Sequence, residues 1–252
     1  MGSAVLTNSL TYLNNEDKNL VLRAFEFAQK AHEGQTRLSG EPYITHLVEV
    51  AKILSELKLD ASVISAALLH DTLEDTAVTE NELQQKFGHE ITFLVRGVTK
   101  ISRLPYETGK KTVENFRRFF LAMAEDIRVV MIKLADRLHN LRTIQYLEPA
   151  DQRRIAQKTM EIYAPLANRL GIAQIKSELE DLCFKVLYPE EYKWLLSQVN
   201  HKYEERIQYL KRVEPIISEE LKKEHVPLER LDFRSKNYWS LYKKLQKYDL
   251  DF

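Results

Sequence analysis

The chain has 252 residues, enough for one large domain or two unequal ones, each with an ample core. Its 37 basic residues balance 37 acidic ones, which argues against a general nucleic-acid or membrane-surface binder but leaves room for a local basic pocket for a phosphorylated ligand. A single cysteine, Cys183, excludes an intramolecular disulfide, and with no signal peptide or long apolar run it indicates a reducing, cytoplasmic setting.

The first two predicted helices flank a polar loop. Seven Gly and seven Pro, with abundant Leu, Lys, Glu and Ala, indicate a mostly helical protein, and apolar spacing predicts a helix from Asn15 to about His32. The loop has one long cationic side chain, Arg37. Its guanidinium group is either solvated or stacks on a base or binds a phosphate. Pro42 suits the first turn of the next helix, whose inner face carries His46, a core histidine or a metal ligand.

A third helix, capped by Asp60, runs into a cluster of ionisable residues. His70 and Asp71 end an apolar stretch, where a buried carboxylate must shift its pKa or find a cation, so they are predicted ligands of a divalent ion. Glu74 and Asp75 follow one turn later and therefore lie near them. Two further carboxylates beside a metal predict water activation, and the sequence does not decide which one takes the proton.

The next helices look structural. The Thr79–Glu82 capping box opens a helix that stops at Gly88, and apolar residues from 91 to 101 predict another. Residues 103–111 combine Pro, Gly and charge, so they form either a loop that closes over a ligand or a plain surface loop. A helix after Thr112 carries an aromatic stripe assigned to the core: Phe116, Phe119, Phe120 and Met123.

The helix predicted at Ile127–Thr143 carries a polar stripe amid apolar residues. Spacings of three, four and three residues align the stripe on one face, and the surrounding apolar positions favour an internal cleft over solvent. His139 is interpreted as a packing histidine, with a partner that orients a metal ligand as the alternative; His32 and His89 are also read as packing residues. The stripe consists of Lys133, Asp136, Asn140 and Thr143.

The second half continues with helical patterns and then changes character. Residues 190–223 form a long, charged amphipathic run interrupted at Pro215, which predicts a connecting helix pair. Val226–Phe233 has the composition of a strand. Arg234 opens a basic pattern, Arg-x-Lys-x-x-x-Ser-x-x-x-Lys.

Two histidines and two aspartates in the order His46, His70-Asp71, Asp136 resemble the signature of the HD metal-dependent phosphohydrolases. A nitrogen and oxygen set without thiolate suits Mn²⁺, Fe²⁺, Mg²⁺ or Zn²⁺ and does not rank them. Longer motifs at 32–46, 69–76, 97–100 and 132–143 resemble the hydrolase domain of the RelA/SpoT homologue family, and the pattern at Arg234 is similar to the opening of that family's synthetase domain. Leu38 departs from the family, where many members carry a second basic residue.

This resemblance implies an all-α HD-domain helical bundle, with a short C-terminal segment that begins an α/β synthetase domain. The expected domains are a hydrolase at 1–195, connecting helices at 196–225 and a truncated synthetase start at 226–252, as in a piece of a longer bifunctional enzyme. The implied reaction removes the 3′-pyrophosphate of ppGpp or pppGpp to give GDP or GTP plus pyrophosphate, in the stringent response.

The family also implies roles for single residues. Mn²⁺ would be held by His46, His70, Asp71 and Asp136, with Glu74 and Asp75 jointly acting on the water. Arg37 would stack on the guanine while Asn140 and Thr143 contact the nucleoside, and Ser39 and Lys133 are weaker candidates, the lysine for phosphate. No DNA or membrane partner is expected, and contact with the ribosome or regulatory proteins would need regions outside this sequence.

Two other functions compete with this one. Another HD phosphohydrolase acting on a different nucleotide would share the metal set but would not require Arg37, Asn140 and Thr143. A regulatory module that binds guanine nucleotides without cutting them would not require a complete metal set, yet all four ligands and the Glu74-Asp75 pair are present.

Overall fold

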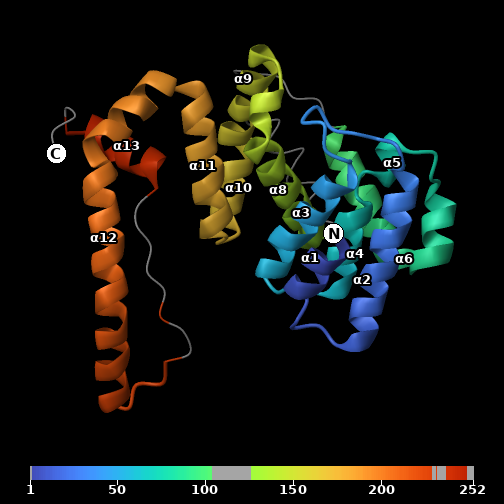
Figure 1. The fold of residues 1–252 in the computed structure, drawn as a ribbon, viewed down its shortest axis with the longest axis horizontal. Coiled ribbons are helices and arrows are strands. Elements are labelled where there is room, and N and C mark those ends of the chain that lie inside the picture. Colours follow the sequence, from blue (N-terminus) through green and yellow to red (C-terminus); the bar gives the residue numbers. More distant parts are fainter. Residues whose placement is uncertain (1, 104–125, 229–230, 232–236, 249–252) are drawn as a thin grey trace. The chain divides into compact units, whose positions relative to one another are not determined.

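A computed structural model describes residues 2–103, 126–228, 231 and 237–248, and all of its regular elements are helices (Figure 1). The predicted all-α fold is therefore confirmed for these residues. The predicted loop at 103–111, beyond Arg103, and the aromatic helix after Thr112 lie outside them. So do Arg234 and most of the predicted strand at 226–233, whose described residues, 226–228 and 231, form no strand.

The chain divides into two compact units, Met1–Leu179 and Glu180–Phe252. The first unit contains α1 (Gly2–Ser9), α2 (Asn15–Ala31), α3 (Ile44–Glu56), α4 (Ala61–Leu69), α5 (Thr72–Asp75), α6 (Glu80–Ser102), α8 (Ile127–Arg142), η1 (Ile144–Tyr146), α9 (Pro149–Lys158), η2 (Thr159–Tyr163), α10 (Ala164–Arg169) and the start of α11 (Ala173–Leu187). The rest of α11, α12 (Pro189–Lys223) and α13 (Tyr238–Gln246) belong to the second. The predicted boundaries at 195 and 225 stay predictions.

Helix α4 is the centre of the first unit. Every residue from Ala61 to Leu69 except Ser62 is buried, because α2, α3, α6 and α8 all pack against it. The predicted cap is present, since the Asp60 carboxylate accepts from the Val63 amide at 2.9 Å. An apolar helix packed between four others holds His70, the residue that follows it, rigidly inside the unit.

The helix predicted to stop at Gly88 does bend there. Gly88 has φ 79°, a left-handed value that favours glycine, and α6 continues beyond the kink to Ser102. The Thr79 cap is present, as its hydroxyl accepts from the Glu82 amide. The kink turns the second half of α6, including Gly97, along α8.

The contact between α6 and α8 requires a glycine. A Cβ atom at Gly97 would lie 2.7 Å from Cγ2 of Val129, closer than carbon atoms tolerate. Gly97→Ala is therefore expected to lower the free energy of unfolding by about 1–3 kcal/mol despite the better helix propensity of alanine. Urea unfolding measures this, and adding Val129→Ala should recover part of the loss. A Gly97→Ala protein as stable as the parent would contradict the close packing.

The second unit is built on aromatic packing. Phe184 of α11 contacts Tyr192, Trp239 and Tyr242, with ring centroids 5.0–5.5 Å apart. The predicted interruption at Pro215 is wrong, because α12 runs through it as one helix. Pro215 is exposed, so water can satisfy the carbonyl that loses its amide partner. Among the described residues, no helix is both apolar and long enough to cross a membrane.

Candidate metal centre

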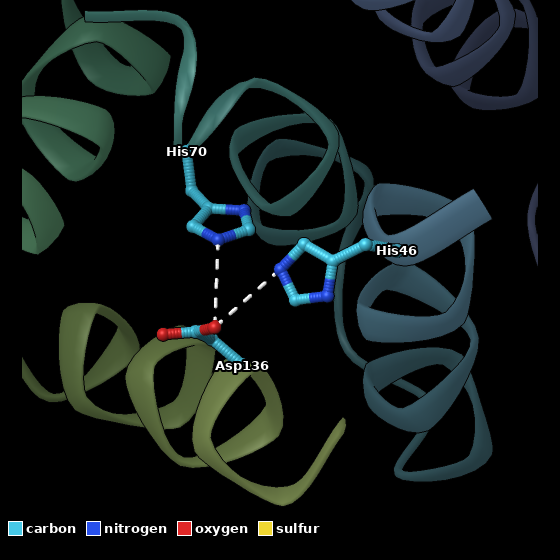
Figure 2. Close-up of side chains that lie close together, drawn as sticks. All are labelled: His46, His70 and Asp136. Carbon is cyan, nitrogen blue, oxygen red and sulfur yellow. Dashed lines mark ion pairs between the residues drawn. The ribbon is translucent and has the colours of Figure 1, made fainter. Parts of the chain in front are cut away.

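Three helices direct side chains to one buried point. His46 comes from α3, His70 follows α4 and Asp136 comes from α8 (Figure 2). Oδ1 of Asp136 lies 3.5 Å from Nε2 of His46 and 3.8 Å from Nε2 of His70, and one possible ligand atom from each residue lies within 4.8 Å of the others. All three side chains are at least 95% buried. Residues far apart in sequence thus form a candidate divalent-metal site.

Asp71 completes the group predicted from the sequence. Its Oδ1 lies 3.1 Å from Nε2 of His70 and its Oδ2 lies 3.7 Å from Nε2 of His46. The carboxylates of Asp71 and Asp136 therefore face the same two ring nitrogens. Two imidazoles and two carboxylates suit Mn²⁺, Fe²⁺, Mg²⁺ or Zn²⁺.

His70 presents its Nε2 atom, rather than Nδ1, to the candidate metal site. Nδ1 of His70 lies 2.7 Å from the carbonyl oxygen of Ala67, which only accepts, so Nδ1 carries the proton. Nε2 of His70 is buried and makes no hydrogen bond. The nearest carboxylate oxygens lie 3.1 and 3.8 Å from this nitrogen, close enough to share a cation with it. The residues present therefore fit a metal ion.

His139 lies directly behind His46. The two Nδ1 atoms are 2.8 Å apart, which leaves Nε2 of His46 facing the carboxylates. Burial, with the neighbouring His46, lowers the pKa of His139 to about 3, so its ring is neutral and its Nδ1 can accept a hydrogen bond from the Nδ1–H of His46. Of the two interpretations made from the sequence, this contact favours a partner that orients His46. Of the other histidines, His32 stacks on Tyr43 and His89 is exposed.

Opposite charges dominate the electrostatics. Burial alone would lower the pKa of His70, but the Asp71 and Asp136 carboxylates outweigh it and raise the pKa to about 10. Burial lowers the pKa of His46. Against the effect of burial, His70 lowers the pKa of Asp71, while Lys133 and both histidines lower the pKa of Asp136. The metal-free centre is thus a compact network of ion pairs.

The raised pKa of His70 predicts that cation binding releases a proton. Because the carboxylates raise the pKa of His70, a proton competes with the cation for the lone pair of Nε2, so Mn²⁺ affinity should rise with pH by up to about tenfold per unit. Calorimetric titration with Mn²⁺ between pH 7 and 9, in buffers of different ionisation enthalpy, measures both affinity and proton release. An affinity that does not change with pH would contradict the protonated state.

A cavity of about 520 Å³ opens beside this centre. It is lined by His46, Asp71 and Asp136 at one end, and the loop between α2 and α3 lines another part. All five residues predicted to bind substrate line the same cavity: Arg37, Ser39, Lys133, Asn140 and Thr143. Their individual roles stay predictions, but the structure places them within one space with the candidate metal ligands.

Arg37 reaches the polar stripe of α8. Its guanidinium donates to Oδ1 of Asn140 at 2.8 Å and to Oγ1 of Thr143 at 3.4 Å. The side-chain amide of Asn140 in turn donates to Oδ1 of Asp136. Ser39 lies nearby, with its hydroxyl donating to Glu41 at 3.3 Å. A continuous hydrogen-bonded path therefore joins the loop arginine to the metal centre.

Lys133, a candidate for phosphate binding, forms a close ion pair with Asp136. Its ammonium lies 2.7 Å from Oδ2 of Asp136 and donates to Oγ of Ser102 at 2.7 Å. Burial would lower the pKa of Lys133, but Asp136 outweighs it and raises the pKa. Here the ammonium neutralises Asp136, while the side chain still lines the cavity.

Glu74 and Asp75 differ in their surroundings. Glu74 lines the cavity, and burial, with the negative Asp71 nearby, raises the pKa of its carboxyl group. Arg103 lies 3.7 Å from its Oε1. Asp75 is exposed, and its carboxylate accepts a hydrogen bond from Tyr43 at 3.0 Å.

Tyr43 was not predicted to belong to the site. Its hydroxyl lies 2.7 Å from Oδ2 of Asp71 as well as 3.0 Å from Asp75. The signal was available, because Tyr43 precedes His46 by three residues and that spacing places both on one face of a helix.

An all-helical unit that directs this histidine and aspartate set inward defines a class of domain. The chain belongs to the HD domain family, whose sequence model matches residues 24–173. Within that class, the resemblance to the RelA/SpoT homologues is confirmed by similarity to known proteins.

Three curated relatives illustrate the similarity. The chain is 46% identical to the bifunctional (p)ppGpp synthase/hydrolase SpoT of Escherichia coli K12 over 93% of its own length and 34% of the relative. It is 45% identical to a GTP pyrophosphokinase of Myxococcus xanthus, over 96% and 32%. It is 46% identical to a guanosine-3′,5′-bis(diphosphate) 3′-pyrophosphohydrolase of Aquifex aeolicus, over 90% and 32%. The chain thus spans about a third of the length of these relatives.

A solved structure is also similar. It is described as a metazoan orthologue of SpoT that hydrolyses ppGpp and plays a role in starvation responses. It matches with a TM-score of 0.54 and 27% identity, covering 69% of this chain and 97% of that one. The predicted HD-domain helical bundle is therefore confirmed.

Proposed function

We propose that this chain is a metal-dependent (p)ppGpp 3′-pyrophosphohydrolase, acting in the cytoplasm on ppGpp or pppGpp. The observation that carries the proposal is one cavity lined both by the histidine and aspartate centre and by Arg37, Asn140 and Thr143. The generic metal set does not require those three residues, whereas recognition of a guanosine substrate would use them. Relatives named for this reaction support the same conclusion.

In the proposed reaction the protein's own residues bind, orient and move one proton. A divalent ion, when held by His46, His70, Asp71 and Asp136, would lower the pKa of a water and offset charge on the attacked phosphate. Glu74 and Asp75 would jointly act on the water that attacks the 3′-pyrophosphate, and the position of Glu74 on the cavity wall, with a raised pKa, supports it as the group that accepts the proton. A P–O bond forms to the water oxygen, the P–O bond to the ribose 3′-oxygen breaks, and that oxygen takes up a proton, which gives GDP or GTP and pyrophosphate.

Substrate binding would use the other side of the cavity. Arg37 is a planar cation that can stack on guanine, and Asn140 and Thr143 can contact the nucleoside once Arg37 turns to the base. Ser39 and Lys133 are weaker candidates for phosphate contacts. We assign Mn²⁺ as the cofactor from the family resemblance, since the ligand set alone does not rank the metals.

Turnover of ppGpp tests the proposal directly. The purified protein should release GDP and pyrophosphate from ppGpp in the presence of Mn²⁺ and should lose this activity with a chelator. Other nucleotides of the same charge serve as controls for the substrate. Tight binding of ppGpp without product would instead support a regulatory module, and faster cleavage of another nucleotide would support a different phosphohydrolase.

The remaining domain assignments are part of the same proposal. Residues 1–195 would form the hydrolase, 196–225 the connection and 226–252 the start of a synthetase domain. The match to 34% of a bifunctional (p)ppGpp synthase/hydrolase supports a hydrolase that is one part of a longer enzyme.

A further inference from the structure

The phenol of Tyr43 lies between two carboxylates at the edge of the metal centre. Its hydroxyl oxygen is 2.7 Å from Oδ2 of Asp71 and 3.0 Å from Oδ2 of Asp75. The ring is fixed on both sides, stacked on His32 at 4.7 Å between centroids and edge-on to His46 at 5.9 Å. A hydroxyl on so constrained a ring can hold a partner in one orientation.

We propose that Tyr43 is a positioning residue that fixes which oxygen of Asp71 faces the cation, a role that rests on the proposed metal centre. A carboxylate can rotate about its Cβ–Cγ bond and exchange its oxygens. With Oδ2 held by the phenol, Oδ1 is directed to Nε2 of His70, 3.1 Å away. Groups that orient a metal ligand in this way raise metal affinity without touching the ion.

The same hydroxyl lies 3.0 Å from Oδ2 of Asp75, so its one proton is shared between two carboxylates, with the shorter contact to Asp71. Asp75 is also tied through its backbone, because the Gln35 side chain donates to its carbonyl at 2.9 Å. The Tyr43 amide donates to the carbonyl of Gln35 at 3.0 Å, which closes the connection between α5 and the loop that carries Arg37. Asp75 is thus engaged with Tyr43 and Gln35, whereas Glu74 is the carboxylate of the pair that lines the cavity.

Tyr43→Phe tests the role, because it removes one oxygen and keeps the ring between His32 and His46. Tyr12→Phe is a matched control in the same unit, where a half-buried phenol donates to the carbonyl of Leu59 at 2.6 Å. We expect Tyr43→Phe to bind Mn²⁺ about 10- to 100-fold more weakly than the parent in calorimetric titrations, and Tyr12→Phe to bind it unchanged. Both should shift the thermal midpoint by a similar small amount.

Turnover gives a second readout. If Tyr43 acts through the metal ligand, saturating Mn²⁺ should restore much of kcat in Tyr43→Phe, while KM for ppGpp stays near the parental value. Parental Mn²⁺ affinity in Tyr43→Phe, or an equal loss in Tyr12→Phe, would overturn the inference, as would a parent protein that binds no Mn²⁺. The titrations contain no nucleotide, so a failure to hydrolyse ppGpp would overturn the proposed function and leave this result standing.

Discussion

Replacing Asp136 by asparagine is expected to lower ppGpp turnover by about a hundred- to a thousandfold. Oδ1 of Asp136 faces both His46 and His70, and a neutral amide supplies neither the charge nor the affinity of a carboxylate. Losing about 3–4 kcal/mol of metal-dependent stabilisation corresponds to that factor. Mn²⁺ titration and release of GDP measure the two effects separately.

The same substitution should also affect folding, because it leaves a buried ammonium without its partner. Lys133 is 8% exposed and lies 2.7 Å from Oδ2 of Asp136, so breaking the pair is expected to cost about 3–5 kcal/mol of unfolding free energy. Adding Lys133→Met should recover stability in urea unfolding but not Mn²⁺ binding. Asp151→Asn is the control, since its half-exposed carboxylate pairs with Arg154 away from the cavity. Full activity in Asp136→Asn would refute the metal centre.

Combining Glu74→Gln with Asp75→Asn is expected to lower turnover by about a hundred- to ten-thousandfold while Mn²⁺ binding persists. Neither residue belongs to the proposed ligand set, and both substitutions keep shape while removing the group that accepts a proton. GDP release at saturating Mn²⁺ and ppGpp measures the loss. The acid limb of the parent's pH profile should lie above the ordinary pKa of a glutamate, because burial raises the pKa of Glu74.

The single variants Glu74→Gln and Asp75→Asn show how much each residue contributes to the loss of turnover. Since Glu74 lines the cavity and Asp75 is engaged with Tyr43, Glu74→Gln should account for most of the loss. Glu16→Gln with Asp17→Asn is the matched control, an adjacent acidic pair in the first turn of α2. A doubly substituted Glu74 and Asp75 protein that released pyrophosphate at the parental rate would show that the proposed mechanism is wrong.

Local spacing was sufficient to predict much of the fold and of the cavity wall. The stripe Lys133, Asp136, Asn140 and Thr143 follows from helical periodicity alone, and all four line the cavity. The Asp60 cap and the bend at Gly88 are also local, since each depends on a few neighbouring residues.

Contacts between helices could not be read from spacing. His139 meets His46 across 93 residues, and the partner of each ring is decided by how α3 and α8 pack. For Tyr43, spacing places the residue beside His46, but its contacts with Asp71 and Asp75 depend on how the start of α3 packs near α5. The helix break predicted at Pro215 is wrong for a different reason, because an exposed helix tolerates a proline that a buried helix would not.

The path from Arg37 through Asn140 to Asp136 has a consequence for selectivity. A nucleotide that draws the guanidinium to its base takes a donor away from Asn140, and the released amide can then turn relative to the carboxylate it holds. Binding of the base by Arg37 would thereby change the position of Asp136 at the candidate metal site. Discrimination between nucleotides should consequently appear as a difference in catalytic rate at saturation, and poor substrates could occupy the enzyme without being consumed.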